Sequence, residues 1–95
     1  VLVDPTSDSF EKLGWAQFRL GDYLASLEAY KSSVAYDDLN WRSLNGIGVN
    51  ELNAWLLSDR TSVGAYQNAR TAFRRSLSIE RDQPKVITLV LRYGL

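Results

Sequence analysis

The sequence contains no cysteine and no histidine, and these two absences exclude several kinds of chemistry. Without cysteine the chain can form neither a disulfide nor a thiolate metal site, and the redox state of its compartment cannot be read from it. Without histidine it lacks the commonest general base and the commonest metal ligand. We therefore expect a non-catalytic protein that holds no metal and no cofactor.

Long apolar runs are also missing. No segment approaches the roughly 18 apolar residues that a membrane helix needs, and no secretory signal is visible. We therefore expect no membrane partner and favour the cytoplasm as the compartment. Because the chain lacks an initiator methionine and begins VLVDP, we also expect a fragment of a longer protein or a processed form.

Charge of one sign does not dominate, since the 95 residues carry 11 basic and 11 acidic side chains. The overall charge thus gives no argument for a nucleic-acid partner. Residues 1–47 carry four basic and seven acidic groups, and residues 48–95 carry the reverse. Arg70, Arg74 and Arg81 fall on one predicted helix face, which we interpret as a solvated surface because no aromatic residues are interleaved there.

Apolar residues recur at helical spacing along almost the whole chain, which has the length of one small domain. The segment Val86–Leu91 has the β-branched content of a strand, but no partner strand is present and we expect it to be helical. The sequence therefore predicts an all-α fold. The predicted helices are Ser9–Leu20, Tyr23–Tyr36, Trp41–Leu57, Tyr66–Ile79 and Lys85–Tyr93. Candidate N-caps are Ser7, Asp8 or Ser9 for the first helix and Asn40 for the third.

Two parts of the chain resemble each other. GDYLASLEAY at 21–30 and GAYQNARTAF at 64–73 share a glycine, a tyrosine two residues later, an alanine eight later and an aromatic nine later. Upstream, FEKLG at 10–14 corresponds to LNGIG at 44–48, which lies 34 residues further on, whereas the downstream copies are 43 residues apart. The second copy therefore carries nine extra residues near 55–63.

With these two phased copies the chain resembles the tetratricopeptide repeat (TPR) family, whose 34-residue unit is a helix–turn–helix. The match lies in the 10–14 and 21–30 motifs and their echoes, and the chain departs from the family at Gln17 and Glu51, where an aromatic is usual. The resemblance implies a right-handed helical-repeat solenoid of about two helix–turn–helix repeats with a C-terminal capping helix.

The resemblance also implies one domain over residues 1–95. Its expected parts are repeat 1 at about 7–40, repeat 2 at about 41–81 with the insertion near 55–63, and a capping helix at about 84–94. VLVDP at 1–5 resembles the tail of a preceding unit. Trp55, Leu56 and Leu57 could extend the third helix over the edge of the core or form an exposed lip.

Four glycines fit this repeat. We expect Gly14 and Gly48 on buried faces, where the missing side chain lets two helices approach closely. Two unfavourable helix glycines in register are otherwise hard to explain, because each costs about 1 kcal/mol relative to alanine. We expect Gly21 and Gly64 at helix ends, in the left-handed conformation that glycine adopts easily.

The first helix of each unit lines the concave surface in this family, so the resemblance implies a binding site there. At about 100° per residue, Trp15 points away from the internal stripe of the first helix. Trp15 is then either a binding anchor or covered by a neighbouring helix, whereas we expect Phe18 to be half-buried. Leu52 is also predicted to face the groove. The candidate partner-binding residues are Trp15, Phe18, Arg19, Arg42, Asn45, Val49 and Asn53.

We therefore expect a non-catalytic scaffold that binds a protein or peptide along its concave face, and not nucleic acid. Some TPR proteins grip a C-terminal carboxylate with a lysine and an asparagine, but Glu11 and Trp15 stand at those positions and exclude this activity here. Two alternatives stay open. The domain could be a structural spacer or a self-association module, or it could be an accessory domain of a larger enzyme or complex.

Overall fold

The computed structural model describes residues 6–95, which form five α-helices and no strand. The all-α class predicted from the periodicity is confirmed, and the β-branched segment Val86–Leu91 is helical. The VLVDP segment, interpreted above as the tail of a preceding unit, lies outside the described residues. The helices are α1 (Ser7–Arg19), α2 (Tyr23–Tyr36), α3 (Trp41–Leu57), α4 (Val63–Ile79) and α5 (Pro84–Tyr93).

Helices α1 to α4 each begin at a side chain that accepts a hydrogen bond from a backbone N–H three residues later, which satisfies one of the unpaired donors of the first turn. The predicted cap Asn40 holds α3 in this way. The prediction for α1 was wrong, because Thr6 is the cap and Ser9 completes a reciprocal capping box with it. Asp22 and Ser62 cap α2 and α4.

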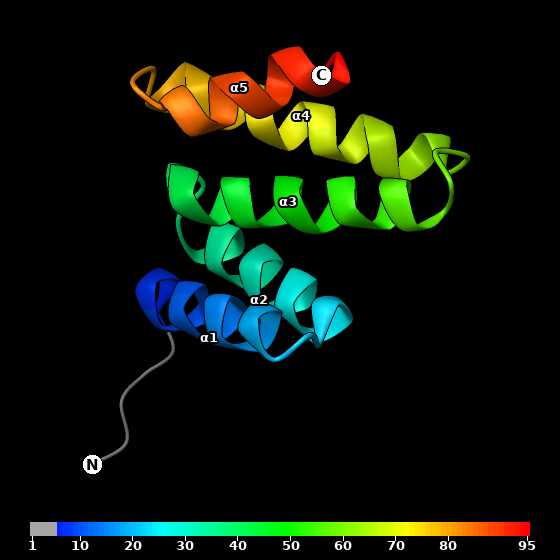
Figure 1. Cartoon of the computed structure of the whole chain (residues 1–95). Coiled ribbons are helices and arrows are strands. Elements are labelled where there is room, and N and C mark those ends of the chain that lie inside the picture. Colours follow the sequence, from blue (N-terminus) through cyan, green and yellow to red (C-terminus); the bar gives the residue numbers. More distant parts are fainter. Residues whose placement is uncertain (1–5) are drawn as a thin grey trace.

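Consecutive helices pack against one another in chain order and run in alternating directions (Figure 1). Helices α1 and α2 form one hairpin, α3 and α4 form a second, and α2 joins the two by packing on α3. Helix α5 packs on α4, and α1 also contacts α3. Val86 of α5 and Leu52 of α3 belong to one buried cluster, so the odd-numbered helices α1, α3 and α5 come close enough to share one surface.

The nine extra residues of the second copy are divided between a longer helix and a turn. Trp55 and Leu56 extend α3 and pack on the buried cluster that holds Phe73, whereas Leu57 is exposed. The ring of Trp55 lies 5.1 Å from that of Tyr66. The reversal follows at 58–62. The extension thus covers the edge of the core, which was one of the two alternatives left open by the sequence.

In each hairpin an aromatic ring rests on a glycine. Gly14 and Gly48 are both buried, as predicted. A Cβ added at Gly14 would lie 3.0 Å from the ring of Tyr30, and one at Gly48 would lie 2.7 Å from the ring of Phe73. Gly46 makes a further notch against Tyr30, with a Cβ distance of 2.5 Å. These positions must remain glycine for the helices to approach as closely as they do.

The two glycines expected at helix ends differ. Gly21 has a φ of +81° and reverses the chain between α1 and α2, as predicted. The prediction for Gly64 was wrong, because it lies in the first turn of α4 and has no positive φ. The insertion moves the reversal upstream, where Asp59 and Arg60 adopt the left-handed conformation with φ of 55° and 62°.

The sequence suggested that the arginine face of α4 is only a solvated surface, but two of these arginines also form hydrogen bonds within the chain. The Nε atoms of Arg70 and Arg74 donate to the backbone oxygen of Leu95 at 3.3 and 2.8 Å. The side chain of Leu95 is buried in the cluster around Phe73. Two of the three arginines therefore fasten the segment after α5 to α4, a role that no local pattern in the sequence could indicate.

We predict that Gly48→Ala lowers the free energy of unfolding by about 1–3 kcal/mol, because the added methyl overpacks the buried ring of Phe73. Gly64→Ala is the matched control, since a Cβ there meets nothing within 4 Å and alanine favours a helix by up to about 1 kcal/mol. Urea unfolding followed by circular dichroism compares the two. Equal stability of the two variants would contradict the close approach.

Candidate functional site

A hollow of about 300 Å³ opens between α1 and α3, and we call it the central hollow. Tyr30 and Gly46 form part of its wall. Of the predicted site residues, only Asn53 does not line it. The predicted residues that line it are Trp15, Phe18, Arg19, Arg42, Asn45 and Val49. The structure thus places six of the seven predicted residues around one hollow.

Two further hollows adjoin the central one and extend it into a groove across α1, α3 and α5. The first has a volume of about 320 Å³ and shares Trp15, Tyr30 and Arg42 with the central hollow. The second has a volume of about 470 Å³, shares Asn45 with it, and reaches Lys85 at the start of α5. We refer to the three hollows together as the groove.

Trp15 is the most prominent apolar side chain of the groove. It is 57% exposed, so no other helix of the described chain covers it. The guanidinium of Arg19 lies 5.0 Å from the centre of its ring, within the range of a cation–π interaction. Phe18 is half-buried, as expected, and its ring lies 5.3 Å from that of Tyr23. The wall formed by α1 is therefore aromatic.

Tyr30 forms the floor of the groove, although it was not among the predicted site residues. Only 7% of its surface is exposed, yet it lines both the central hollow and the neighbouring one. Burial raises the pKa of its phenol, and the nearby carboxylate of Glu11 raises it further. Gly46 opens the notch that holds the ring of Tyr30. Gly46 lies one helical turn after Arg42, on the same face of α3, so a position without a side chain there could have indicated that the ring of another residue reaches the groove.

The polar wall of the groove comes from the first half of α3. The Nε of Arg42 lies 3.2 Å from both carboxylate oxygens of Glu11, and its guanidinium lies over the ring of Trp41. The Nδ2 of Asn45 donates to Oε1 of Gln83 at 2.7 Å. Arg42 and Asn45 are therefore held in place by α1 and by the residue before α5.

The second half of α3 departs from the prediction. Leu52 was expected to face the groove, but it is 5% exposed and belongs to the cluster around Phe73. Val49 is half-buried and reaches both the groove and this cluster. Asn53 is half-buried and lies outside the groove. The groove thus ends near Val49, because α4 and α5 cover the neighbouring face of α3.

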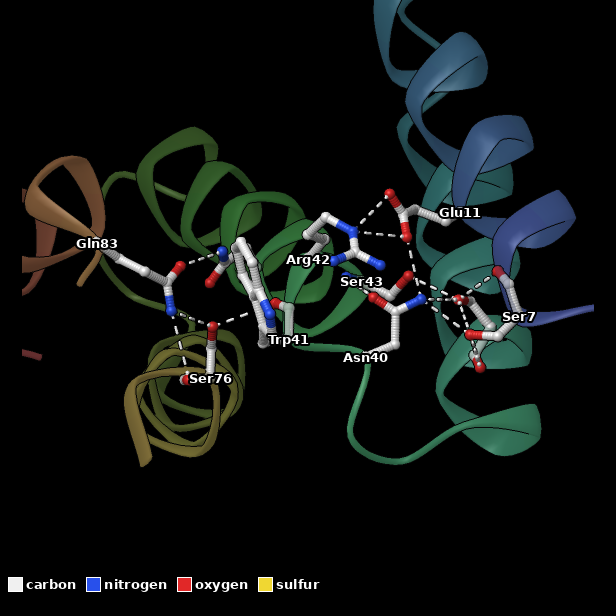
Figure 2. A network of polar contacts seen from close by, with 10 residues as sticks. Ser7, Glu11, Asn40, Trp41, Arg42, Ser43, Ser76 and Gln83 are labelled. Carbon is white, nitrogen blue, oxygen red and sulfur yellow. Dashed lines mark hydrogen bonds and ion pairs between the residues drawn. The ribbon is translucent and has the colours of Figure 1, made fainter. Parts of the chain in front are cut away.

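A buried polar network fixes where α3 begins relative to α1 (Figure 2). The Ser33 hydroxyl donates to the backbone oxygen of Ser7 at 2.7 Å and lies 2.6 Å from the hydroxyl of Ser43. The side-chain amide of Asn40 donates to the hydroxyl of Ser7, to Oε1 of Glu11 and to the hydroxyl of Ser33. The same side chain caps α3, so one residue sets both the helix start and the carboxylate that binds Arg42.

The second hairpin contains a corresponding network (Figure 2). The Ser76 hydroxyl donates to the backbone oxygen of Trp41 at 3.1 Å, and the Nε2 of Gln83 donates to the Ser76 hydroxyl at 3.0 Å. Trp41 lies 34 residues after Ser7, and Ser76 and Gln83 lie 43 residues after their counterparts. The two hairpins therefore share this contact in the register of the sequence repeat.

No family model matches the chain, and no curated protein matches its sequence. Among α1 to α5, none is both long enough and apolar enough to cross a membrane. The interpretation of the groove therefore depends on its geometry.

We predict that Ser33→Ala lowers the free energy of unfolding by about 1–3 kcal/mol, because it removes the hydrogen bond to the backbone oxygen of Ser7 and leaves the buried hydroxyl of Ser43 without its partner. Ser32→Ala is the control, since it removes a hydroxyl from the same helix that forms no hydrogen bond within the described chain, and we expect a change of about 0.5 kcal/mol or less. Chemical unfolding of both variants checks this. A cost for Ser32→Ala as large as that for Ser33→Ala would contradict the role of the network.

We also predict that stability falls as the pH rises above about 10, where the tyrosines of an unfolded chain lose their protons. The raised pKa means that the folded state keeps the Tyr30 proton where the unfolded state loses it, so this contribution is present below the unfolded pKa and is lost as the pH rises through the folded one. Unfolding measured at neutral and alkaline pH should show a smaller loss for Tyr30→Phe. An unchanged loss would contradict the effect of burial.

Proposed function

We propose that the two hairpins and α5 form a right-handed helical-repeat array of the TPR type. Support comes from contacts that recur in the register of the sequence repeat. Gly14 with Tyr30 has its counterpart in Gly48 with Phe73, and the serine network of the first hairpin has its counterpart around Ser76. Independent helix pairs would have no reason to repeat both an apolar and a polar contact at the same two spacings.

We propose that this domain is a non-catalytic scaffold that binds an extended segment of a protein along the groove. The observation that carries the proposal is the convergence of six predicted residues on one hollow that contains an exposed tryptophan. Tryptophan and arginine are enriched among the residues that dominate the energy of protein interfaces. An exposed tryptophan with an arginine stacked on it presents both in one place.

The lining of the groove indicates the kind of segment that would fit. Trp15, Phe18, Tyr30 and Val49 give the central hollow an apolar surface suited to one apolar side chain of the partner. Burying that side chain would contribute about 1.5–3 kcal/mol. Arg42 and the polar groups beside it would donate to the backbone oxygens of the segment. The adjoining hollows would receive the side chains before and after the anchor.

We predict that Trp15→Ala weakens binding at least about 30-fold, as expected for loss of a central anchor. Peptides selected from a random library against the wild-type domain serve as probes, and fluorescence anisotropy of the labelled peptides gives the dissociation constants. Leu57→Ala is the control, because Leu57 is an exposed apolar residue outside the groove. Selected peptides that bind both variants as well as they bind the wild type would place the site elsewhere.

A further inference from the structure

A fourth hollow lies on the other side of α3, between α2 and α4, and we call it the rear hollow. Its volume is about 290 Å³. Ile47 lines it, whereas Asn45, two residues earlier, lines the groove. Two positions correspond to about 200° around a helix, so these side chains point in nearly opposite directions. Leu44 of α3, Val34 of α2 and Ala72 of α4 complete its apolar surface. The rear hollow is therefore separate from the groove.

One carboxylate lines this apolar hollow. Glu51 is only 8% exposed, and its Oε2 accepts a hydrogen bond from Nδ2 of Asn68 at 3.2 Å. Among residues 6–95 the ion pairs join Glu11 with Arg42 and Glu28 with Lys31, so Glu51 forms no ion pair within the described chain. A carboxylate that is largely removed from water without a paired cation is costly, and a cationic group that pairs with it offsets part of this cost.

The other oxygen of this carboxylate is available to such a group. Oε1 of Glu51 accepts no hydrogen bond from the described residues. It is not among the orphaned oxygens that are sealed from solvent, which belong to Gln17, Asn45 and Asn50. Oε1 therefore remains open to the rear hollow.

Two cations also line the rear hollow. Lys31 and Arg75 line it from α2 and α4, and both side chains are exposed. Lys31 makes a loose pair with Glu28 at 3.7 Å. On α4, Arg75 lies seven residues after Asn68, the partner of Glu51, which is about 10 Å along the helix axis, so the buried carboxylate and this cation lie apart along the hollow, with apolar side chains in its lining. A ligand complementary to this arrangement carries a cation at one end, an aliphatic body and an anion at the other end.

We propose that the rear hollow binds an aliphatic chain with an ammonium group at one end and a carboxylate at the other, as in lysine or an ω-amino acid. The ammonium group donates to Oε1 of Glu51, and the methylene groups cover Ile47 and its apolar neighbours. The carboxylate pairs with Lys31 and Arg75 by charge-assisted hydrogen bonds, which are stronger than neutral ones. This site is independent of the function proposed for the groove.

The test uses 6-aminohexanoate as the probe and two-dimensional ¹H–¹⁵N spectra of the whole chain as the readout. We expect saturable shifts at the amides of Ile47, Glu51 and Ala72, with a dissociation constant of about 1 mM, the weak range usual for one small ligand. Hexylamine and hexanoate each lack one charge and should bind at least about tenfold more weakly. Shifts that do not saturate, or that map to the groove, would overturn the proposal.

Two variants separate the two ends of the ligand. Glu51→Gln keeps the size of the side chain and removes its charge, and it should weaken binding of 6-aminohexanoate at least about tenfold. Arg75→Ala should weaken binding of 6-aminohexanoate without weakening that of hexylamine. Because Arg75 is exposed, this second variant tests the site even if Glu51→Gln fails to fold. Asp38→Asn is the control, since Asp38 is exposed and lines none of the hollows, and it should change neither affinity.

Three further ligands test which natural molecule carries the ammonium group and the carboxylate that the rear hollow would bind. Free lysine and a short peptide that ends in lysine both carry the ammonium group and the carboxylate, and tighter binding of either supports the proposal and names the source. The same peptide with an amidated C-terminus lacks the carboxylate and should bind at least about tenfold more weakly. Equal binding of the acid and the amide would overturn the role assigned to Lys31 and Arg75.

Discussion

The contact between an aromatic ring and a glycine notch is the constraint on which the rest of the structure depends. Tyr30 rests on Gly14 and Gly46, and Phe73 rests on Gly48. Rings this large fit between neighbouring helices only where the facing residue has no side chain, so each contact fixes how closely two helices approach. Because Tyr30 is also the floor of the groove, the same contact that holds α2 against α1 and α3 determines the depth of the candidate site.

Buried serines and amides then fix the register that the apolar contacts leave free. The hydrophobic effect has no preferred direction, whereas a buried hydroxyl that loses its acceptor bears its full desolvation cost. Ser33 and Ser76 bind the first residues of α1 and α3, and Asn40 and Gln83 lock the next helix to the same point. Since Gln83 also holds Asn45, the register of the hairpins positions a polar residue of the groove.

The helices could be predicted from the sequence because they follow from local periodicity. Helical arithmetic gives the direction of a side chain about the axis of its own helix, and the resemblance to the TPR family implied which direction faces a groove. It does not say which neighbour covers that direction, so Leu52 was placed in the groove although α4 and α5 bury it. For the same reason the hydrogen bonds from Arg70 and Arg74 to Leu95 could not be foreseen, since they join residues more than 20 positions apart.

Helix α3 can serve two sites because residues on opposite faces of it line the groove and the rear hollow. Helices α2 and α4 both pack on it, and the rear hollow lies between them, whereas α1 and α5 extend its other face into the groove. Glu51 lies 34 residues after Gln17, at the corresponding position of the sequence repeat. On α1 the orphaned oxygen of Gln17 is sealed from solvent, but on α3 an oxygen of Glu51 remains open to a hollow. A polar residue in a repeat position therefore becomes a candidate site only where helices on both sides of it leave room for a ligand.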